Sequence, residues 1–158
     1  MQFKRTEHMK NLLLILSITF FSNIYGQESN DTLSYVKTEI IIPEGCWTKS
    51  KYEVIDCNGF SAQWLYLKPE MINQGIDKPL FSQIEQQFQY SKKSELKFKS
   101  QNQDFEGFQY KMKNGTTRIL GLGKVDGQWL ILNLGFEGGL KKNSELSEFE
   151  RNFIELEK

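Results

Sequence analysis

The stretch "RILGLGKVDGQW", residues 118–129, decides how this chain folds, because its three glycines suit either a phosphate-binding loop or a β-hairpin. A phosphate-binding loop needs glycines between a strand and a helix, so that backbone N–H groups converge at the helix N-terminus. The segment after Gly127 is "QWLILNLGF", which is typical of a strand. Asp126-Gly127 between two such runs is a strong signal for a two-residue hairpin turn. The stretch therefore predicts a strand, a turn and a second strand.

This hairpin also predicts the register of its neighbours. A two-residue turn at 126–127 places Gly121 opposite Leu132, and a two-residue turn at 114–115 places the same glycine opposite Phe108. Glycines at such positions leave room for large neighbouring side chains. One face of the sheet is then expected to collect Phe108, Tyr110, Met112, Ile119, Val125, Leu130, Leu132, Leu134 and Phe136.

The remaining chain predicts further strands and two helices. Strands are expected at 35–42, on both sides of the Asn58-Gly59 turn in 52–68, at 95–101 and at 105–113. The helices are expected at 77–91 and 144–157, with apolar stripes formed by Leu80, Ile84 and Phe88 in the first and by Leu146, Phe149, Phe153 and Leu156 in the second. Ser147 and Glu150 have the spacing of a capping box.

These elements predict a single α+β domain over residues 34–158. Its antiparallel sheet has about six or seven strands, ends in a C-terminal meander, and carries the two main helices packed on it, as in an α-β-α sandwich.

The first 26 residues have the pattern of a secretory signal peptide. A basic start, "MQFKRTEHMK", precedes "LLLILSITFF", an apolar run too short to span a bilayer, and Gly26 offers a cleavage site. A buried or anchoring helix is the alternative interpretation. Residues 27–33 are expected to form a flexible N-terminus of the mature chain. We therefore expect a periplasmic or extracellular protein with no stable membrane span after cleavage.

Cleavage after Gly26 also restricts the chemistry, because it removes His8, the one histidine. The signal carries three basic residues and one acidic residue, so the mature chain keeps 17 basic and 19 acidic residues. Ser-His-Asp, Cys-His and histidine-based zinc sites are excluded, and two cysteines alone cannot form a structural zinc site. Carboxylates lack the spacing of calcium loops or glycosidases. We expect no metal, no cofactor and no nucleic-acid partner, and we favour a protein that is not an enzyme.

Cys46 and Cys57 are expected to form a disulfide, because exported proteins fold in an oxidising compartment. Cys46 reaches Cys57 only if residues 46–49 fold back beside the strand that ends at Cys57. Free buried thiols and a bridge to another chain are the alternatives. Trp47 is either an exposed anchor for a partner or ligand, or, as we favour, a side chain that packs on the disulfide and closes the core.

The predicted meander is rich in lysine, with eight basic and four acidic residues over 92–136. A three-residue loop after Gln101 would pair Phe98 with Phe108 and bring Lys111 beside Arg118. The resulting basic patch is a candidate site for an anionic partner such as a phosphate, an acidic glycan or an acidic protein surface, and comprises Lys97, Lys99, Lys111, Lys113 and Arg118. The alternative is a solvated sheet face that keeps the edge from aggregating.

The order of these elements resembles that of PsbP-like proteins, which include extrinsic photosystem subunits and small exported bacterial relatives. The local motif is "IIPEGCW", in which Pro43, Gly45 and Trp47 match a Pro-x-Gly-Trp-like element after the first strand and Cys46 interrupts it. The resemblance implies an α-β-α sandwich without catalysis. It carries over no metal-binding residue, because the mature chain has no histidine.

Together these features predict an exported, non-enzymatic protein of the cell envelope or the extracellular space. Its partner is an unknown protein, an anionic envelope component or a small anionic ligand. One alternative is a secreted enzyme inhibitor or immunity-type protein that acts through a loop such as 43–51 or 69–78. The other is a hydrolase that uses carboxylates alone.

Overall fold

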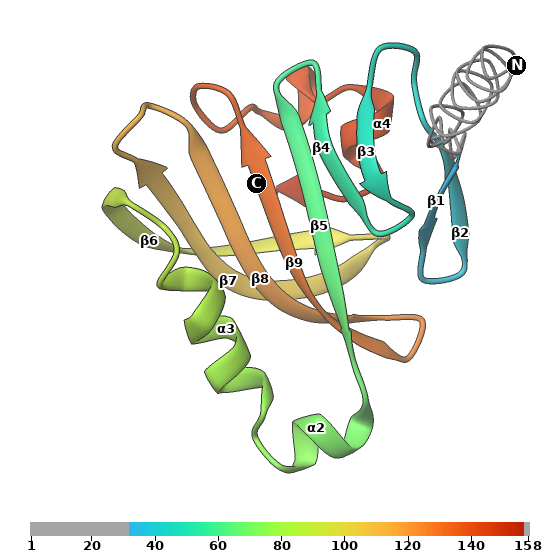
Figure 1. The fold of residues 1–158 in the computed structure, drawn as a ribbon, viewed down its shortest axis with the longest axis vertical. Helices are drawn as coiled ribbons and strands as arrows, with labels where there is room; N and C mark the ends of the chain where they lie inside the picture. Colours follow the sequence, from blue (N-terminus) through green and yellow to red (C-terminus); the bar gives the residue numbers. More distant parts are fainter. Residues whose placement is uncertain (1–31, 157–158) are drawn as a thin grey trace, which may run out of the picture.

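The computed structural model describes residues 32–156, which form a mainly β structure (Figure 1). Ten strands are accompanied within this range by three short α-helices and one 3₁₀ turn. The first half contains β1 (Thr32–Tyr35), β2 (Thr38–Ile41), β3 (Trp47–Ser50), β4 (Glu53–Cys57), β5 (Phe60–Leu67), α2 (Pro69–Asn73) and α3 (Asp77–Glu85). The second half contains β6 (Tyr90–Ser100), β7 (Gln103–Met112), β8 (Thr117–Val125), β9 (Gln128–Phe136), η1 (Asn143–Glu145), α4 (Glu148–Arg151) and β10 (Glu155–Leu156). The predicted signal peptide, 1–26, lies outside the described residues.

Eight strands form one antiparallel sheet in the order β10-β6-β7-β8-β9-β5-β4-β3, and β1 pairs with β2 in a separate hairpin. The sheet twists so strongly that β6 crosses the direction of β5 in Figure 1. We call the face that carries Ile119, Leu134 and Ala62, which lie opposite one another on β8, β9 and β5, the inner face. The outer face carries Arg118, Gly135 and the residues that alternate with the inner set.

The hairpin at 118–129 is confirmed. Val125 pairs with Gln128, and the two turn residues both have positive φ, 46° at Asp126 and 86° at Gly127, as a type I′ turn requires. Gly121 lies opposite Leu132, as predicted. A Cβ on Gly121 would lie 2.7 Å from the Phe98 ring, so this glycine makes room for an aromatic side chain.

The predicted register of β7 is wrong by one residue. The β7–β8 connection is a three-residue loop closed by a hydrogen bond from the Met112 N–H to the Thr116 carbonyl, so Phe108 lies opposite Leu120 rather than Gly121. The predicted three-residue loop between β6 and β7 is also wrong, because a two-residue turn at 101–102 joins these strands and pairs Phe98 with Phe105 rather than with Phe108. Because side chains alternate between faces, the shift moves three predicted inner-face residues, Phe108, Tyr110 and Met112, to the outer face.

The predicted C-terminal helix at 144–157 is also wrong, although its capping box is confirmed. The Ser147 hydroxyl accepts from the Glu150 N–H at 3.2 Å, and the Glu150 carboxylate accepts from the Ser147 N–H at 2.7 Å. The helix ends after one turn, because the Asn143 side chain bonds both the N–H and the carbonyl of Leu156 and holds it beside β6. The α+β sandwich with two main helices is therefore replaced by a β-rich fold in which α2 and α3 cover part of one face.

The N-terminal prediction needs two corrections. Residues 35–42 are not one strand, because Val36 has a φ of 56° and turns the chain from β1 into β2. The flexible terminus predicted at 27–33 includes Leu33, but the side chain of this residue is fully buried in β1. The ordered domain thus begins earlier than residue 34.

The main hydrophobic core lies on the inner face, under the β1–β2 hairpin and the C-terminal segment. Five aromatic rings meet there at centroid distances of 5.1–6.2 Å: Tyr35, Phe60, Trp64, Phe149 and Phe153. The Tyr35 hydroxyl shares a 2.8 Å hydrogen bond with Ser100, and burial raises the pKa of this tyrosine. This core joins the β1–β2 hairpin and the C-terminal segment to the sheet.

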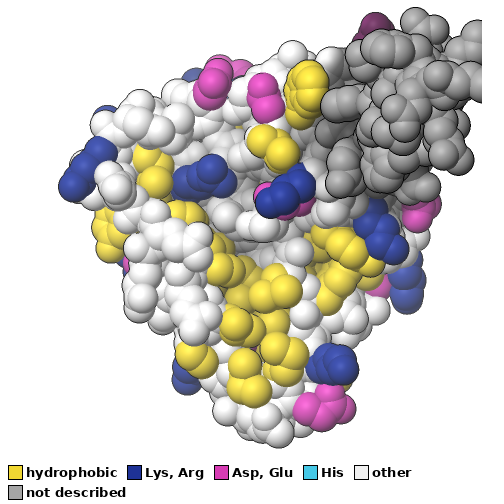
Figure 2. All heavy atoms as spheres, viewed as in Figure 1, with side chains coloured by type: hydrophobic (Ala, Val, Ile, Leu, Met, Phe, Trp, Pro, Cys, Tyr) yellow, Lys and Arg dark blue, Asp and Glu magenta, His cyan; other side chains and the backbone are white. Residues whose placement is uncertain are grey.

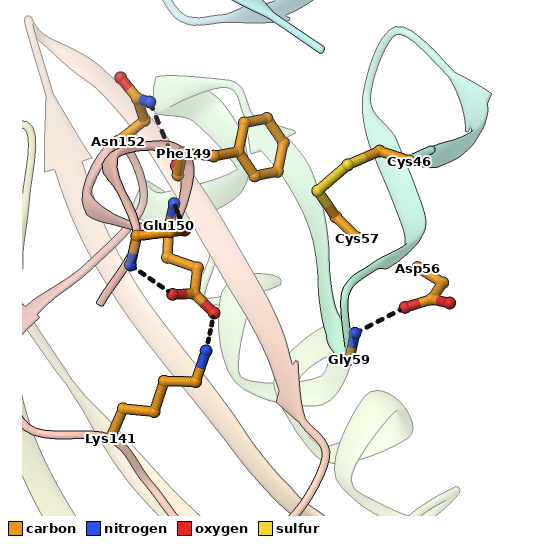
Figure 3. Close-up of a disulfide and its surroundings, with 9 residues drawn as sticks. Cys46, Asp56, Cys57, Gly59, Lys141, Phe149, Glu150 and Asn152 are labelled. Carbon is orange, nitrogen blue, oxygen red and sulfur yellow. Dashed lines mark hydrogen bonds and ion pairs between the residues drawn. A yellow bond between two sulfur atoms is a disulfide. The ribbon is translucent and has the colours of Figure 1, made fainter. Parts of the chain in front are cut away.

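The Cys46–Cys57 disulfide is confirmed, with a Cα–Cα distance of 4.3 Å (Figure 3). As its geometry requires, β3 folds back along β4, so that Trp47 lies opposite Asp56. Both cysteines pack in the inner core. The bridge therefore ties the edge strand β3 to the body of the sheet.

Removing this bridge should lower the free energy of unfolding by about 3 kcal/mol, because it releases a short closed loop in the unfolded chain. The variant is Cys46→Ala with Cys57→Ala, measured by urea unfolding. Adding a reductant to the unmodified protein should give a loss of similar size. An unchanged urea midpoint in both experiments would show that the bridge does not restrain the unfolded chain.

Candidate functional site

Two lysines of the predicted basic patch lie on the outer face and face acidic partners. Lys97 lies opposite Glu106 with 3.8 Å between the charged atoms, and Lys99 lies opposite Asp104 at 3.7 Å. The Glu106 and Asp104 side chains are about 80% exposed (82% and 79%). Ion pairs this exposed contribute little to stability and leave no strong local excess of positive charge.

The other three residues of the patch are separated by the register of β7. Lys111 lies opposite Thr117 and therefore points to the face opposite to Arg118. Lys113 lies in the exposed loop after β7. The predicted contact between Lys111 and Arg118 is therefore wrong, because the one-residue shift in the register of β7 separates these two side chains. Of the five cations, Lys97 and Arg118 line cavities, and of these two only Arg118 is half-buried.

Arg118 belongs to a row of residues that crosses three strands on the outer face. It lies opposite Gly135 on β9, which in turn lies opposite Ser61 on β5. This row lines a cavity of about 330 Å³ near the β4–β5 turn. Other lining residues are Ile55, Asp56, Gly59, Asn114, Thr116 and Glu137. We call this cavity the arginine pocket.

The charge of Arg118 is not balanced by an ion pair inside residues 32–156, since no carboxylate there comes within 4.0 Å of the guanidinium. Burial lowers the pKa of the guanidinium, but arginine stays protonated in proteins. The two acidic residues of the pocket serve the Asn58-Gly59 turn instead. The Asp56 carboxylate accepts from the Gly59 N–H at 2.9 Å, and the Glu137 side chain lies against Gly59.

Gly135 shapes the floor of the arginine pocket. A Cβ at this position would collide with the Ser61 hydroxyl and would lie 3.2 Å from both Cζ and Nη1 of Arg118. The guanidinium and the hydroxyl therefore approach the same point above the sheet. A cation and a hydroxyl donor that converge on open space are typical of a site for a carboxylate or phosphate group.

A second cluster of apolar side chains lies on the outer face, and most of its members are only partly buried. We call it the outer apolar cluster. Its buried members are Leu67, Tyr110, Leu120 and Ile131. Its partly buried members are Met71, Ile72, Leu80, Phe81, Ile84, Phe88, Tyr90, Phe108, Met112, Leu122 and Trp129. The predicted helix at 77–91 is confirmed only over Asp77–Glu85, so Leu80 and Ile84 of its predicted apolar stripe lie on α3 and Phe88 lies beyond its end. Neither α2 nor α3 has a fully buried residue. Figure 2 shows hydrophobic side chains on the surface between α3 and β5 and down to α2.

A groove of about 1000 Å³ lies along one side of α3, and we call it the helix groove. Its apolar lining comprises Phe81, Leu96, Phe108, Leu122 and Trp129, and Lys78, Lys97 and Lys124 also line it. Its carboxylates belong to Asp77, Glu85, Glu95, Asp104 and Glu106. Glu85 pairs with Lys93, so three of the five carboxylates are matched by lysines. Residues 32–156 also contain no group of three metal-binding side chains.

Trp47 differs from the favoured prediction. Its side chain does not close the core, because the residue is 65% exposed on β3. Ile55, on the neighbouring strand, is 55% exposed and lines the arginine pocket. The exposed anchor, which was the other interpretation of Trp47, agrees with this placement.

Sequence reasoning found Arg118 but missed the residues around it. Ser61 and Gly135 reach Arg118 through the pairing of β5 with β9, which joins segments about 70 residues apart in the chain. Asn133, whose buried Oδ1 has no hydrogen-bond partner among the described atoms, was missed for the same reason. A polar residue in the apolar run "QWLILNLGF" was the available signal.

No protein-family model, curated protein or solved structure matches this chain.

Proposed function

We propose that this protein is an exported, non-enzymatic binding protein that holds the anionic group of a small ligand at Arg118. The observation that carries the proposal is a half-buried guanidinium without an ion pair inside the described domain, directed over Gly135 into a cavity that also contains a serine hydroxyl. Keeping a cation partly desolvated costs free energy, and an anionic ligand recovers it. A carboxylate or a phosphate fits the fork of donors that arginine presents.

Arg118→Gln should weaken binding of acetate and inorganic phosphate by at least about tenfold, because it removes a charge-assisted hydrogen bond. Backbone amide shifts around Gly135 in ¹H–¹⁵N NMR titrations measure the affinity. Lys99→Gln is the matched control, since it removes the same charge from the same face at a position that lines neither cavity of this face. Equal loss in both variants, or no binding by the unmodified protein, would refute a site at Arg118.

The Cys46–Cys57 bridge supports the proposed export, because disulfides form and persist in oxidising compartments outside the cytosol. Within residues 32–156, no helix combines the length and the apolar character needed to cross a membrane. The protein isolated from the periplasm or the medium should begin at Gln27, as N-terminal sequencing would show. Retention of the encoded Met1 on the exported protein would contradict cleavage after Gly26. A relationship to PsbP-like proteins remains a prediction from the sequence.

The second candidate function is binding to a protein partner, as an inhibitor or immunity-type protein would do. The exposed Trp47 favours it, because tryptophan on a strand held by a disulfide is a rigid, large contact surface. Trp47→Ala should abolish capture of a partner from the native envelope while leaving the binding of phosphate unchanged. Capture that survives this substitution would exclude Trp47 as the anchor.

A further inference from the structure

We infer that the ligand held at Arg118 is a long-chain carboxylate, whose apolar chain lies along the outer face from the arginine pocket toward the helix groove. This inference rests on the proposed function, since it uses the same site for the anionic group. It adds the class of the ligand and the surface that binds the rest of the molecule.

The outer face changes from polar to apolar along three neighbouring strands. On β5 the outer residues run Ser61, Gln63, Leu65, Leu67. On β9 they run Gly135, Asn133, Ile131, Trp129, and on β8 they run Arg118, Leu120, Leu122, Lys124. The register places these residues in rows across the three strands. Ser61 and Arg118 lie in the first row, and Lys124 is the one polar residue in the last row. An amphiphilic ligand with an anionic head matches this order.

The apolar end of this face is incompletely covered. Leu65 on β5 is 43% exposed, although it lies opposite the buried Ile131. Leu122 and Trp129, at the far ends of β8 and β9, line the helix groove. Figure 2 shows that the hydrophobic surface between α3 and β5 continues to the end of the molecule that carries α2. The apolar surface therefore begins beyond the row of Gln63, Asn133 and Leu120 and leads from there toward the groove.

The dimensions of the path suit a long chain. Arg118 and Lys124 are six residues apart on β8, a distance of about 20 Å at the rise of a strand. A carboxylate at Arg118 thus places its chain beside Leu65 and its end near Trp129. The two cavities of the outer face, one with a cation that has no ion pair inside residues 32–156 and one lined by aromatic rings and charged side chains, then belong to one extended site.

A series of straight-chain carboxylates tests the inference by isothermal titration calorimetry on the purified protein, below the concentrations at which they form micelles. Affinity should rise from acetate through hexanoate to decanoate, by about fourfold for each methylene that becomes buried. Decanol, which has the chain without the anion, should bind at least about tenfold more weakly than decanoate.

Variants separate the two ends of the site. Arg118→Gln should weaken every carboxylate, whereas Leu65→Asn should weaken decanoate by at least about tenfold and leave acetate unchanged. Ile41→Asn is the matched control, because Ile41 is 76% exposed on β2 and does not belong to the outer apolar cluster. Each variant's melting temperature is measured alongside to confirm that it folds.

The outcomes distinguish this inference from the proposed function. Equal affinity for acetate and decanoate, with a loss in Arg118→Gln, would overturn the long-chain ligand and keep the anion site. Absence of binding by any carboxylate or phosphate would overturn both. Decanol binding as tightly as decanoate, or an unchanged chain-length dependence in Leu65→Asn, would remove the ligand from this path.

Discussion

Replacing Phe153 by alanine should lower the free energy of unfolding by about 3–5 kcal/mol. Phe153 is fully buried, and its ring lies 5.2–5.8 Å from the ring centroids of Tyr35, Phe60, Trp64 and Phe149. The substitution leaves a cavity between the sheet and the C-terminal segment, and these elements cannot close it without moving the capped turn of α4. Thermal unfolding followed by circular dichroism should show a fall in Tm on the order of 10–20 °C.

Ile41→Ala controls for the general cost of truncating a large side chain, since Ile41 is 76% exposed. This variant should unfold within about 0.5 kcal/mol of the unmodified protein. If the Tm of Phe153→Ala stays within a degree or two of the control, the C-terminal segment is not docked on the inner face in solution.

Gly107→Ala should be at least as damaging, with a loss of more than about 3 kcal/mol. Gly107 lies opposite Gly121 in the middle of the β7–β8 pair. A Cβ on Gly107 would collide with the Leu120 carbonyl oxygen and lie 2.5 Å from the Gly121 Cα. These neighbours are backbone atoms of a central strand, so no side-chain rotation relieves the clash, and β7 must separate from β8.

Gly139→Ala is the matched control, because a Cβ there meets no atom within 4 Å and the backbone has no positive φ. Urea unfolding should leave this variant within about 0.5 kcal/mol of the parent and shift Gly107→Ala to a much lower midpoint. A Gly107→Ala variant as stable as the control would mean that β7 and β8 do not approach each other this closely.

The elements predicted correctly are those specified by adjacent residues. The Asp126-Gly127 turn supplies its own positive φ values, so the β8–β9 hairpin and its register followed from a few residues. The Asn114-Gly115 dipeptide suggested the same type of turn, but three residues form that loop. Turn residues therefore located the loop between β7 and β8, but they did not determine its length, and one residue changed the face of every side chain on β7.

The C-terminal segment shows why tertiary partners limit such predictions. Phe149 and Phe153 have helical spacing, and both are buried as expected. One helical turn is enough to bury them, and the chain after it is extended because Asn143 and β6 provide hydrogen bonds that a helix would not use. The hydrophobic periodicity correctly identified the buried residues, while hydrogen bonds to distant residues determined the backbone conformation.

The candidate site was predictable only in part. Arg118 was selected because it belongs to a lysine-rich meander, but the neighbours that distinguish it are Ser61 and Gly135. Their proximity depends on the pairing of β5 with β9, which local patterns do not specify. The exposure of Trp47 was missed because a short edge strand offers few neighbours against which a tryptophan could pack.

The order of strands in the large sheet has a consequence for how the chain is made. β5 bonds to β9, and β6 bonds to β10, so segments synthesised early are completed by partners near the end of the described chain. Contacts so distant in sequence make folding slow, because long loops must close before these contacts form. During synthesis, β5 lacks its partner β9 and the inner core lacks Phe149 and Phe153, so we expect the domain to fold only after these segments have been made. If the protein is exported as proposed, this delay would help to keep the chain unfolded for passage through a translocation channel.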